Sequence, residues 1–314
     1  MLTYILKRIL LALLTLLGAS ILTFALGRLA PGDPVETLLG AVQNPSIEEI
    51  ELAREYLGLD RPMYQQYTIW LSRVLRGDFG RSYATNQPVT HEIAIRLPAT
   101  LSLMASSAIV MIGTGFLMGI VSALNQNKPI DFLIRAFSTL ITAIPAFCIG
   151  ILLIIIFAVR LNWLPLLPTG GMGHLILPSV TIGLGAGAGL ARLIRAQIIT
   201  ARQKEHVRAA LVFGVNKRLA FINNVLKNSA PPIITNIGLF SGALLGGSAI
   251  IETLFSWPGA GRFAVDAIMG RDYPVIQAYA LIMAAIYVAV NLLTDVINNI
   301  LAPGTDVLGV SSVD

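Results

Sequence analysis

The sequence predicts an all-α integral membrane protein with six transmembrane helices. Of its 314 residues, 55% are hydrophobic and only 12% are charged, and the mean hydropathy is +0.75. A soluble domain usually carries about a quarter charged residues, so we expect lipid to solvate most of this surface. The apolar runs are long and unbroken, which favours helices over the short alternating strands of a membrane barrel.

Six apolar runs are long enough to cross a bilayer. The first follows Lys7 and Arg8, is longer than the core of a signal peptide and precedes no small-residue cleavage site, so we expect it to be retained. The fourth has glycine at every second position from Gly183 to Gly189, which permits close helix packing in lipid. The predicted spans are residues 9–29, 99–124, 132–159, 175–194, 231–251 and 276–301.

Basic residues gather on one side of the predicted membrane. Lys7 and Arg8 precede the first span, and Lys128 lies between the second and third. The segment between the fourth and fifth spans carries eight more: Arg192, Arg195, Arg202, Lys204, Arg208, Lys217, Arg218 and Lys227. Positive loops stay in the cytoplasm. We therefore expect both termini to be cytoplasmic and residues 30–98, 160–174 and 252–275 to be external.

The spans divide the chain into four parts. Residues 1–29 form the cytoplasmic N-terminus and first span, 30–98 an external segment, 99–301 a core of five helices, and 302–314 a tail. The external segment has a helix start at Ser46, with acidic residues in the first turn, and a second helical pattern over 63–75. We expect two short helices that cover the outer mouth.

The core contains a cytoplasmic segment, residues 195–230, that is too polar to span a membrane and too rich in helix formers to be disordered. We expect a helix over Glu205–Leu211, a turn at Gly214 and a helix cap at Asn216. Ala209 and Ala210 leave a small-sided surface against which another protein can pack. An ordinary basic loop is the alternative.

The pattern Glu205, Ala209-Ala210 and Gly214, followed by Asn228 and Pro231-Pro232, resembles the cytoplasmic signature of binding-protein-dependent ABC importer permeases. Motifs along nearly the whole chain are similar to the peptide/nickel branch of that family: PGDP at 31–34, LGLDRP at 57–62, GDFG at 77–80, IETLFSWPGAGR at 251–262 and RDYPVIQ at 271–277. The resemblance implies the type I permease fold of ABC importers, with a coupling helix between spans four and five.

The resemblance also implies the working unit. This would be a heterodimer with a second permease chain, two ATPase subunits and an external substrate-binding protein, in the bacterial inner membrane. ATP and magnesium would bind the ATPase subunits, and this chain would be a non-catalytic subunit without a cofactor. Glu205, Ala209, Ala210 and Gly214 would couple to the ATPase. Val212 and Phe213 depart from the branch, which usually has a small and a basic residue there, and suggest a more apolar contact.

Further candidates lie in the last two spans and in the external segment between them. Gly242, Gly246, Gly247 and Ser248 are small residues that would line the pore or serve helix packing. Glu252, Arg262 and Asp272 would lie at the outer mouth, as pore-mouth charges or as parts of the loop structure. Asp295 is the intramembrane acid of span six, and we expect it to be solvated or paired.

Enzyme and metal motifs are missing from the sequence. It contains no Walker lysine motif, and HEIAI at 91–95 lacks the second histidine of a zinc protease. His174 is a weak metal-ligand candidate, because a site needs several ligands. A secondary transporter or channel and an intramembrane enzyme are the competing classes, and nucleic acid is not an expected partner. Relatives of the branch carry nickel chelates, dipeptides, oligopeptides or glutathione-like peptides, and the short 160–174 connection resembles the nickel and glutathione permeases.

Overall fold

A computed structural model describes residues 2–29, 35, 46–165 and 173–301. Helices account for most of these residues, and the described ranges contain no strand beyond an isolated bridge between Arg81 and Pro88. The helices are α1 (Leu2–Leu29), α3 (Ile47–Leu57), α4 (Met63–Val74), α5 (Val89–Leu124), α6 (Pro129–Ala143), α7 (Ala146–Leu153), the π-helix η1 (Ile154–Arg160), α8 (Gly173–Gln203), α9 (Glu205–Val212), α10 (Lys217–Ala220), the π-helix η2 (Phe221–Leu226), α11 (Lys227–Leu254), α12 (Ala260–Met269) and α13 (Tyr273–Leu301).

The predicted membrane class is confirmed. Among the described residues, α1, α5, α8, η2 with α11, and α13 are each long and apolar enough to cross a membrane. The third predicted span corresponds to a bent pair, α6 and α7 with η1, in which the chain direction changes by 102° between the two halves. The expectation of one continuous helix over 132–159 is therefore wrong. Pro145 cannot continue the hydrogen-bond ladder and keeps Ile144 extended, with a ψ of 129°.

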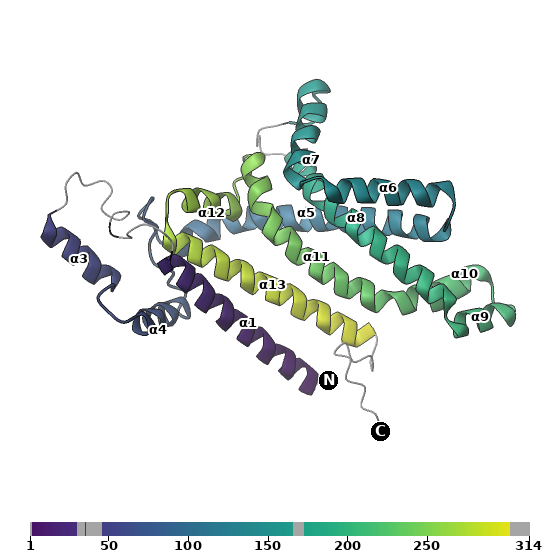
Figure 1. The fold of residues 1–314 in the computed structure, drawn as a ribbon, viewed down its shortest axis with the longest axis horizontal. Helices are drawn as coiled ribbons and strands as arrows, with labels where there is room; N and C mark the ends of the chain where they lie inside the picture. Colours follow the sequence, from purple (N-terminus) through teal and green to yellow (C-terminus); the bar gives the residue numbers. More distant parts are fainter. Residues whose placement is uncertain (1, 30–34, 36–45, 166–172, 302–314) are drawn as a thin grey trace.

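The long helices run side by side, so that the bundle has two ends (Figure 1). The end that carries α9, α10 and the start of α1 is called here the α9 end, and the end that carries α3, α4 and α12 the α12 end. The α5–α6 turn also lies at the α9 end. Successive spans alternate in direction, and the described part of the chain has the six predicted crossings when the bent pair is counted as one span.

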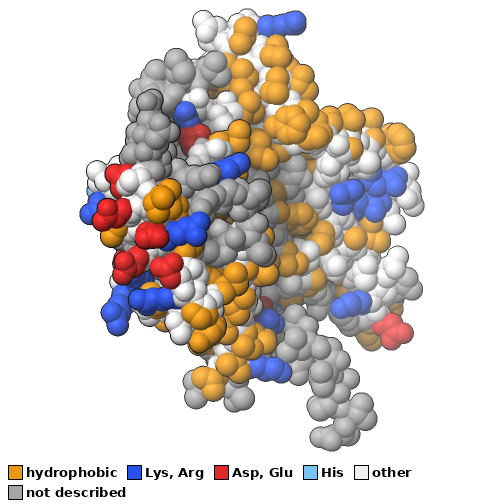
Figure 2. Space-filling model, turned by 60° about the vertical axis from the view of Figure 1, so that its left-hand side comes forward, with side chains coloured by type: hydrophobic (Ala, Val, Ile, Leu, Met, Phe, Trp, Pro, Cys, Tyr) orange, Lys and Arg blue, Asp and Glu red, His pale blue; other side chains and the backbone are white. Residues whose placement is uncertain are grey.

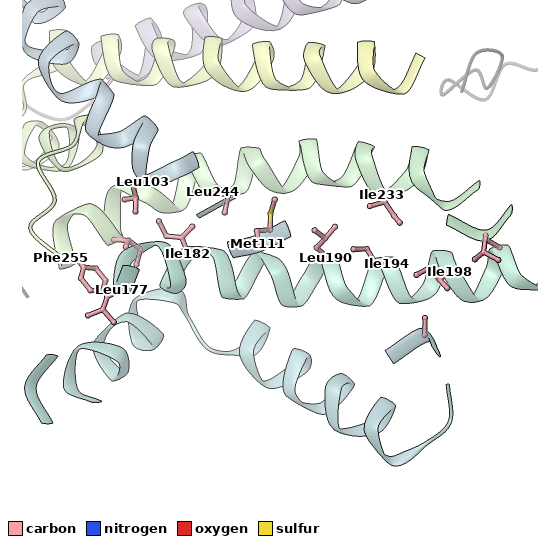
Figure 3. Close-up of a cluster of buried hydrophobic side chains, with 14 of the residues drawn as sticks. Leu103, Met111, Leu177, Ile182, Leu190, Ile194, Ile198, Ile233, Leu244 and Phe255 are labelled. Atoms are coloured by element: carbon pink, nitrogen blue, oxygen red, sulfur yellow. The ribbon is translucent and has the colours of Figure 1, made fainter. Parts of the chain in front are cut away.

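The core of the bundle is built around α8. Side chains from α5 and α11, among them Met111, Ile233 and Leu244, pack against Leu190 and Ile194 of α8 (Figure 3). Glycines bring α5 and α8 close together: a Cβ added at Gly183 would lie 2.6 Å from the carbonyl oxygen of Ser107, and one at Gly119 would lie 2.8 Å from that of Ala191. The glycine-rich sequence of the fourth span thus serves close helix packing, as in other membrane bundles.

The surface has an extensive apolar part and a charged part. Figure 2 shows hydrophobic side chains over much of the visible flank, with most of the visible acidic side chains gathered among basic ones at the left and further basic side chains at the right. Many large hydrophobic side chains of α1, α6 and α7 are exposed. An apolar expanse of this size is typical of a surface that faces lipid or partner helices.

The two short helices expected in the external segment are α3 and α4. Ser46 starts α3 with a capping box, in which its hydroxyl accepts a hydrogen bond from the backbone of Glu49 and the Glu49 carboxylate accepts one from the backbone of Ser46. The Glu49 carboxylate also accepts a hydrogen bond from the Ser46 hydroxyl at 3.0 Å, and the two bonds that it accepts lower the pKa of Glu49. Tyr67 and Trp70 of α4 pack on Phe24 of α1, which fixes α4 at the α12 end.

Candidate functional site

The α9 projection, residues 204–220, extends from the bundle at the α9 end (Figure 1). The chain leaves α8 at Lys204 and starts again as a helix at Glu205. Gly214 has a φ of 82°, a left-handed conformation that only glycine adopts without strain, and it turns the chain after α9. The side chain of Asn216 accepts a hydrogen bond from the backbone N–H of Arg218 at 2.9 Å and caps α10. The predicted helix, turn and cap are all present.

The projection has a buried base and an exposed apolar tip. Val207 is buried and packs in the same hydrophobic cluster as Ala201 of α8 and Val225 of η2. At the tip, Val212 is 85% exposed and Phe213 is 87% exposed. Because these two exposed apolar side chains adjoin each other at the end of the projection, the tip is a candidate contact surface.

The predicted coupling residues all belong to this projection. Glu205 is the exposed first residue of α9, and Ala209 is exposed one turn later. Gly214 is exposed beside Phe213. The side chain of Ala210 lies outside the described part of the chain, although its backbone is helical. The structure thus places Ala209 and Gly214 on the same projection as the apolar tip.

The predicted pore-lining residues do not share one environment. A Cβ on Gly242 would collide with the ring of Tyr287, so this glycine serves the packing of α11 on α13. Ser248 is fully buried and donates a hydrogen bond to the carbonyl of Leu245 at 2.9 Å. Gly246 and Gly247 instead face open space. Of the four candidates, only this adjacent pair lies on a face of α11 that no other described residue of this chain covers.

Glu252 lies at the α12 end but does not point into solvent. It is fully buried, and its Oε2 accepts a hydrogen bond from the backbone N–H of Arg262 at 2.9 Å. The hydroxyl of Thr100 accepts a second one from the N–H of Ala260 at 2.8 Å. Two side chains from other helices therefore cap the start of α12. The indole N–H of Trp257 donates a third hydrogen bond, to the backbone carbonyl of Ala99 at 2.8 Å, which links the segment before α12 to α5.

Asp272 is also a buried structural acid. Its Oδ2 accepts a hydrogen bond from the hydroxyl of Ser82 at 2.5 Å and one from the backbone N–H of Ala84 at 3.3 Å. This ties the segment before α5 to the turn before α13. The sequence left two interpretations open for Glu252 and Asp272. The geometry favours a role in loop structure over that of an exposed pore-mouth charge.

Sequence reasoning missed an ionic site at the α9 end. It named Asp295 as the acid within the spans, and that residue pairs with Arg8 at 3.1 Å. The acid of the bent span, Asp131, is fully buried and is held by Arg195 of α8. An acidic residue in the first turn of an apolar helix was the available signal. Its partner, 64 positions further on, was interpreted only as part of a basic loop.

His174 is buried at the start of α8. Among the described residues, no group of three or more His, Cys, Asp or Glu side chains is arranged to hold a metal ion. His174 therefore has no set of co-ligands within the described part of the chain.

Two family models together match almost the whole chain. Residues 115–307 match the model described as the binding-protein-dependent transport system inner membrane component. Residues 1–104 match the N-terminal model of the same membrane component. The chain belongs to this family. It is thus an integral inner-membrane subunit of an ABC importer, and the resemblance noted from the sequence is confirmed.

Curated relatives and a solved structure agree with this assignment. The chain is 38% identical over 297 residues to the glutathione transport system permease protein GsiC of Escherichia coli (strain K12) and to that of Shigella dysenteriae serotype 1 (strain Sd197), covering 95% of this chain and 96% of each relative. These relatives are consistent with the peptide/nickel branch. A solved structure described as an amino acid ABC transporter with histidines matches with a TM-score of 0.51 and 19% identity, over 67% of this chain and 92% of that one. It supports the fold alone.

Proposed function

We propose that this permease subunit passes short peptides of the glutathione class across the inner membrane, driven by ATP hydrolysis on separate subunits. The observation that carries the coupling to an ATPase is the α9 projection, whose exposed apolar tip has a buried base in the bundle. The family and the relatives of peptide type support an importer. In this proposal the chain itself catalyses no reaction, and ATP and magnesium bind its partners.

The α9 end is the cytoplasmic end in this proposal. The basic residues of α8 and of the segment that follows it gather there, together with the start of α1. Positive segments near span ends remain in the cytoplasm. The α12 end, with α3 and α4, then faces the external substrate-binding protein, and both termini are cytoplasmic.

Docking of the projection would couple ATP hydrolysis to the bundle. The tip residues Val212 and Phe213 enter an apolar groove on an ATPase subunit, while Ala209 allows close approach. Gly214 sets the direction of the tip through its left-handed backbone. When the two ATPase subunits close on ATP, they draw the projections of the two permease chains together. The differential affinity of the ATPase for the two arrangements supplies the driving force.

The second permease chain covers the open face of α11 in this proposal. Five exposed residues recur along that helix at helical spacing: Leu239, Ala243, Gly246, Gly247 and Ile250. Small residues let two membrane helices approach closely. The adjacent pair Gly246 and Gly247 would lie at this contact or beside the substrate path between the two chains.

The substrate class is tested by transport. The chain is expressed with its partner permease, ATPase and binding-protein subunits, and ATP-dependent uptake of labelled glutathione is compared with that of a labelled dipeptide and of nickel, with and without histidine. We expect saturable glutathione or dipeptide uptake that nickel does not inhibit. Uptake of nickel that peptides fail to compete with would replace the peptide proposal by a chelated-metal one. Uptake that continues without the ATPase subunits would favour a secondary transporter.

A further inference from the structure

The first half of the bent span, α6, is attached to the bundle by a face that contains small polar residues. Its buried residues are Asp131 and Ser138, both small and polar. Five of its seven large apolar side chains are exposed, namely Ile130, Phe132, Leu133, Phe137 and Leu140, whereas Ile134 and Ile141 are half-buried. In lipid, large apolar side chains face the acyl chains and small or polar residues form the helix contacts, so Asp131 and Ser138 mark the face by which α6 is attached.

The strongest of these contacts is at Asp131. Arg195 of α8 binds its carboxylate through two parallel hydrogen bonds, Nε to Oδ1 at 2.7 Å and Nη2 to Oδ2 at 2.8 Å. The hydroxyl of Ser122 donates to Oδ1 at 2.5 Å, and the backbone N–H of Asn127 donates to Oδ2 at 3.0 Å. Arg135 approaches Oδ1 to 3.5 Å. Donors from α5, the α5–α6 turn and α8 therefore meet on one buried carboxylate.

This ion pair lies close to the α9 projection. Arg195 precedes the last residue of α8, Gln203, by eight positions, which is about 12 Å along a helix. A single residue, Lys204, separates α8 from α9, and Val207 of α9 is buried in the cluster that contains Ala201 of α8. The projection is thus packed onto the same end of α8 that holds Asp131.

We infer that the Asp131–Arg195 ion pair is the positioning contact that carries movement of α9 into α6. This inference rests on the proposed docking of α9 on an ATPase subunit. A bidentate guanidinium–carboxylate pair fixes both distance and orientation, whereas apolar side chains can slide past one another. When the projection moves, α8 moves with it, and the pair makes α6 follow. The bend at Pro145 then converts that displacement into a change in the angle between α6 and α7.

The test separates transmission from assembly. The complete transporter is purified with Arg195→Met, Arg195→Lys or Asp131→Asn, and with Arg192→Met as the matched control, an exposed arginine one turn away on the same helix. ATPase activity is measured without and with the binding protein loaded with glutathione. We expect each variant of the pair to retain its ATPase subunits and its basal activity but to lose stimulation by about fivefold or more, the lower range for coupled sites. The control should match the original protein.

A double variant keeps the test informative if single variants assemble poorly. Losing one partner leaves a buried charge unpaired, whereas Asp131→Asn with Arg195→Gln removes both charges and preserves hydrogen-bonding groups. We expect this double variant to assemble better than either single one, yet to remain poorly stimulated, because an amide pair lacks the rigid two-bond geometry. Full stimulation in a well-assembled double variant would overturn the inference.

A distance measurement tests the same point directly. Spin labels at exposed Leu133 of α6 and exposed Gln203 of α8, in a Cys148→Ser background, report whether the two helices move together. We expect one distance that ATP leaves unchanged, and a broader or ATP-dependent distance in Arg195→Met. Unchanged distances in that variant would contradict the inference. If the original protein shows no stimulated ATPase activity with any substrate, the proposed function is wrong. If the original protein and all variants show normal stimulation, only the role of the ion pair is wrong.

Discussion

Replacing Phe213 by alanine should weaken the binding of the ATPase subunits without affecting the fold. The side chain is 87% exposed at the tip of the α9 projection, so this chain gains little from it. Burying a phenylalanine side chain in an apolar groove is worth about 1.5–3 kcal/mol. Since about 1.4 kcal/mol corresponds to a tenfold change in affinity, the variant should bind the ATPase about ten- to a hundredfold more weakly.

The assay titrates purified ATPase subunit onto the permease in detergent, without the binding protein. Met269→Ala is the matched control, because Met269 is 83% exposed but lies in α12 at the opposite end of the bundle. The control should bind the ATPase like the original protein. Equal affinity of Phe213→Ala and the original protein would refute burial of the tip in an ATPase groove.

Three further predictions concern the turn, the cap of α12 and the topology. Gly214→Leu should abolish uptake and stimulated ATPase activity while the amount of protein in the membrane stays unchanged, because leucine is strained at the φ of 82° found there. The control is Gly58→Leu, which imposes similar strain after α3, where φ is 66°, and this variant should still bind the ATPase. Equal behaviour of the two variants would count against a coupling turn at Gly214. Glu252→Ala should destabilise the detergent-solubilised chain by about 1–3 kcal/mol in thermal unfolding, because the start of α12 loses its buried hydrogen-bond acceptor. The control Asp266→Ala, on the exposed side of α12, should unfold like the original protein. Equal stability of the two variants would contradict a capping role for Glu252. A green fluorescent protein fused after the last residue should fluoresce and an alkaline phosphatase there should be inactive, and the opposite pattern would invert the proposed orientation.

The fold was largely predictable, because lipid leaves few options for the backbone. Long apolar runs located the spans, and the signals around Ser46, Gly214 and Asn216 correctly predicted local structure because they act within a few residues. The bend at Pro145 was overlooked although proline is a reliable break signal. Apolar length alone had suggested one continuous helix.

The functional geometry was less predictable, because it depends on contacts between distant residues. Nothing in the sequence around Asp131 indicates that Arg195 holds it, and α8 had to be placed beside α6 before the pair could be seen. The same holds for Glu252, whose role as a cap depends on the return of the chain at Arg262. Gly242 and Gly246 look equivalent in the sequence. They differ in the structure, because Tyr287 packs against Gly242 and no described residue packs against Gly246.

The position of α1 has a consequence for synthesis. This helix packs mainly on α13, the last described helix, and to a smaller extent on α4, and Arg8 pairs with Asp295 of α13. Roughly 240 residues separate α1 from α13, which a ribosome needs about 12–50 s to translate. During that interval α1 sits in the bilayer without its main neighbour. Because its surface is largely apolar, α1 is stable in lipid without a partner helix, and the bundle is complete once α13 packs against α1.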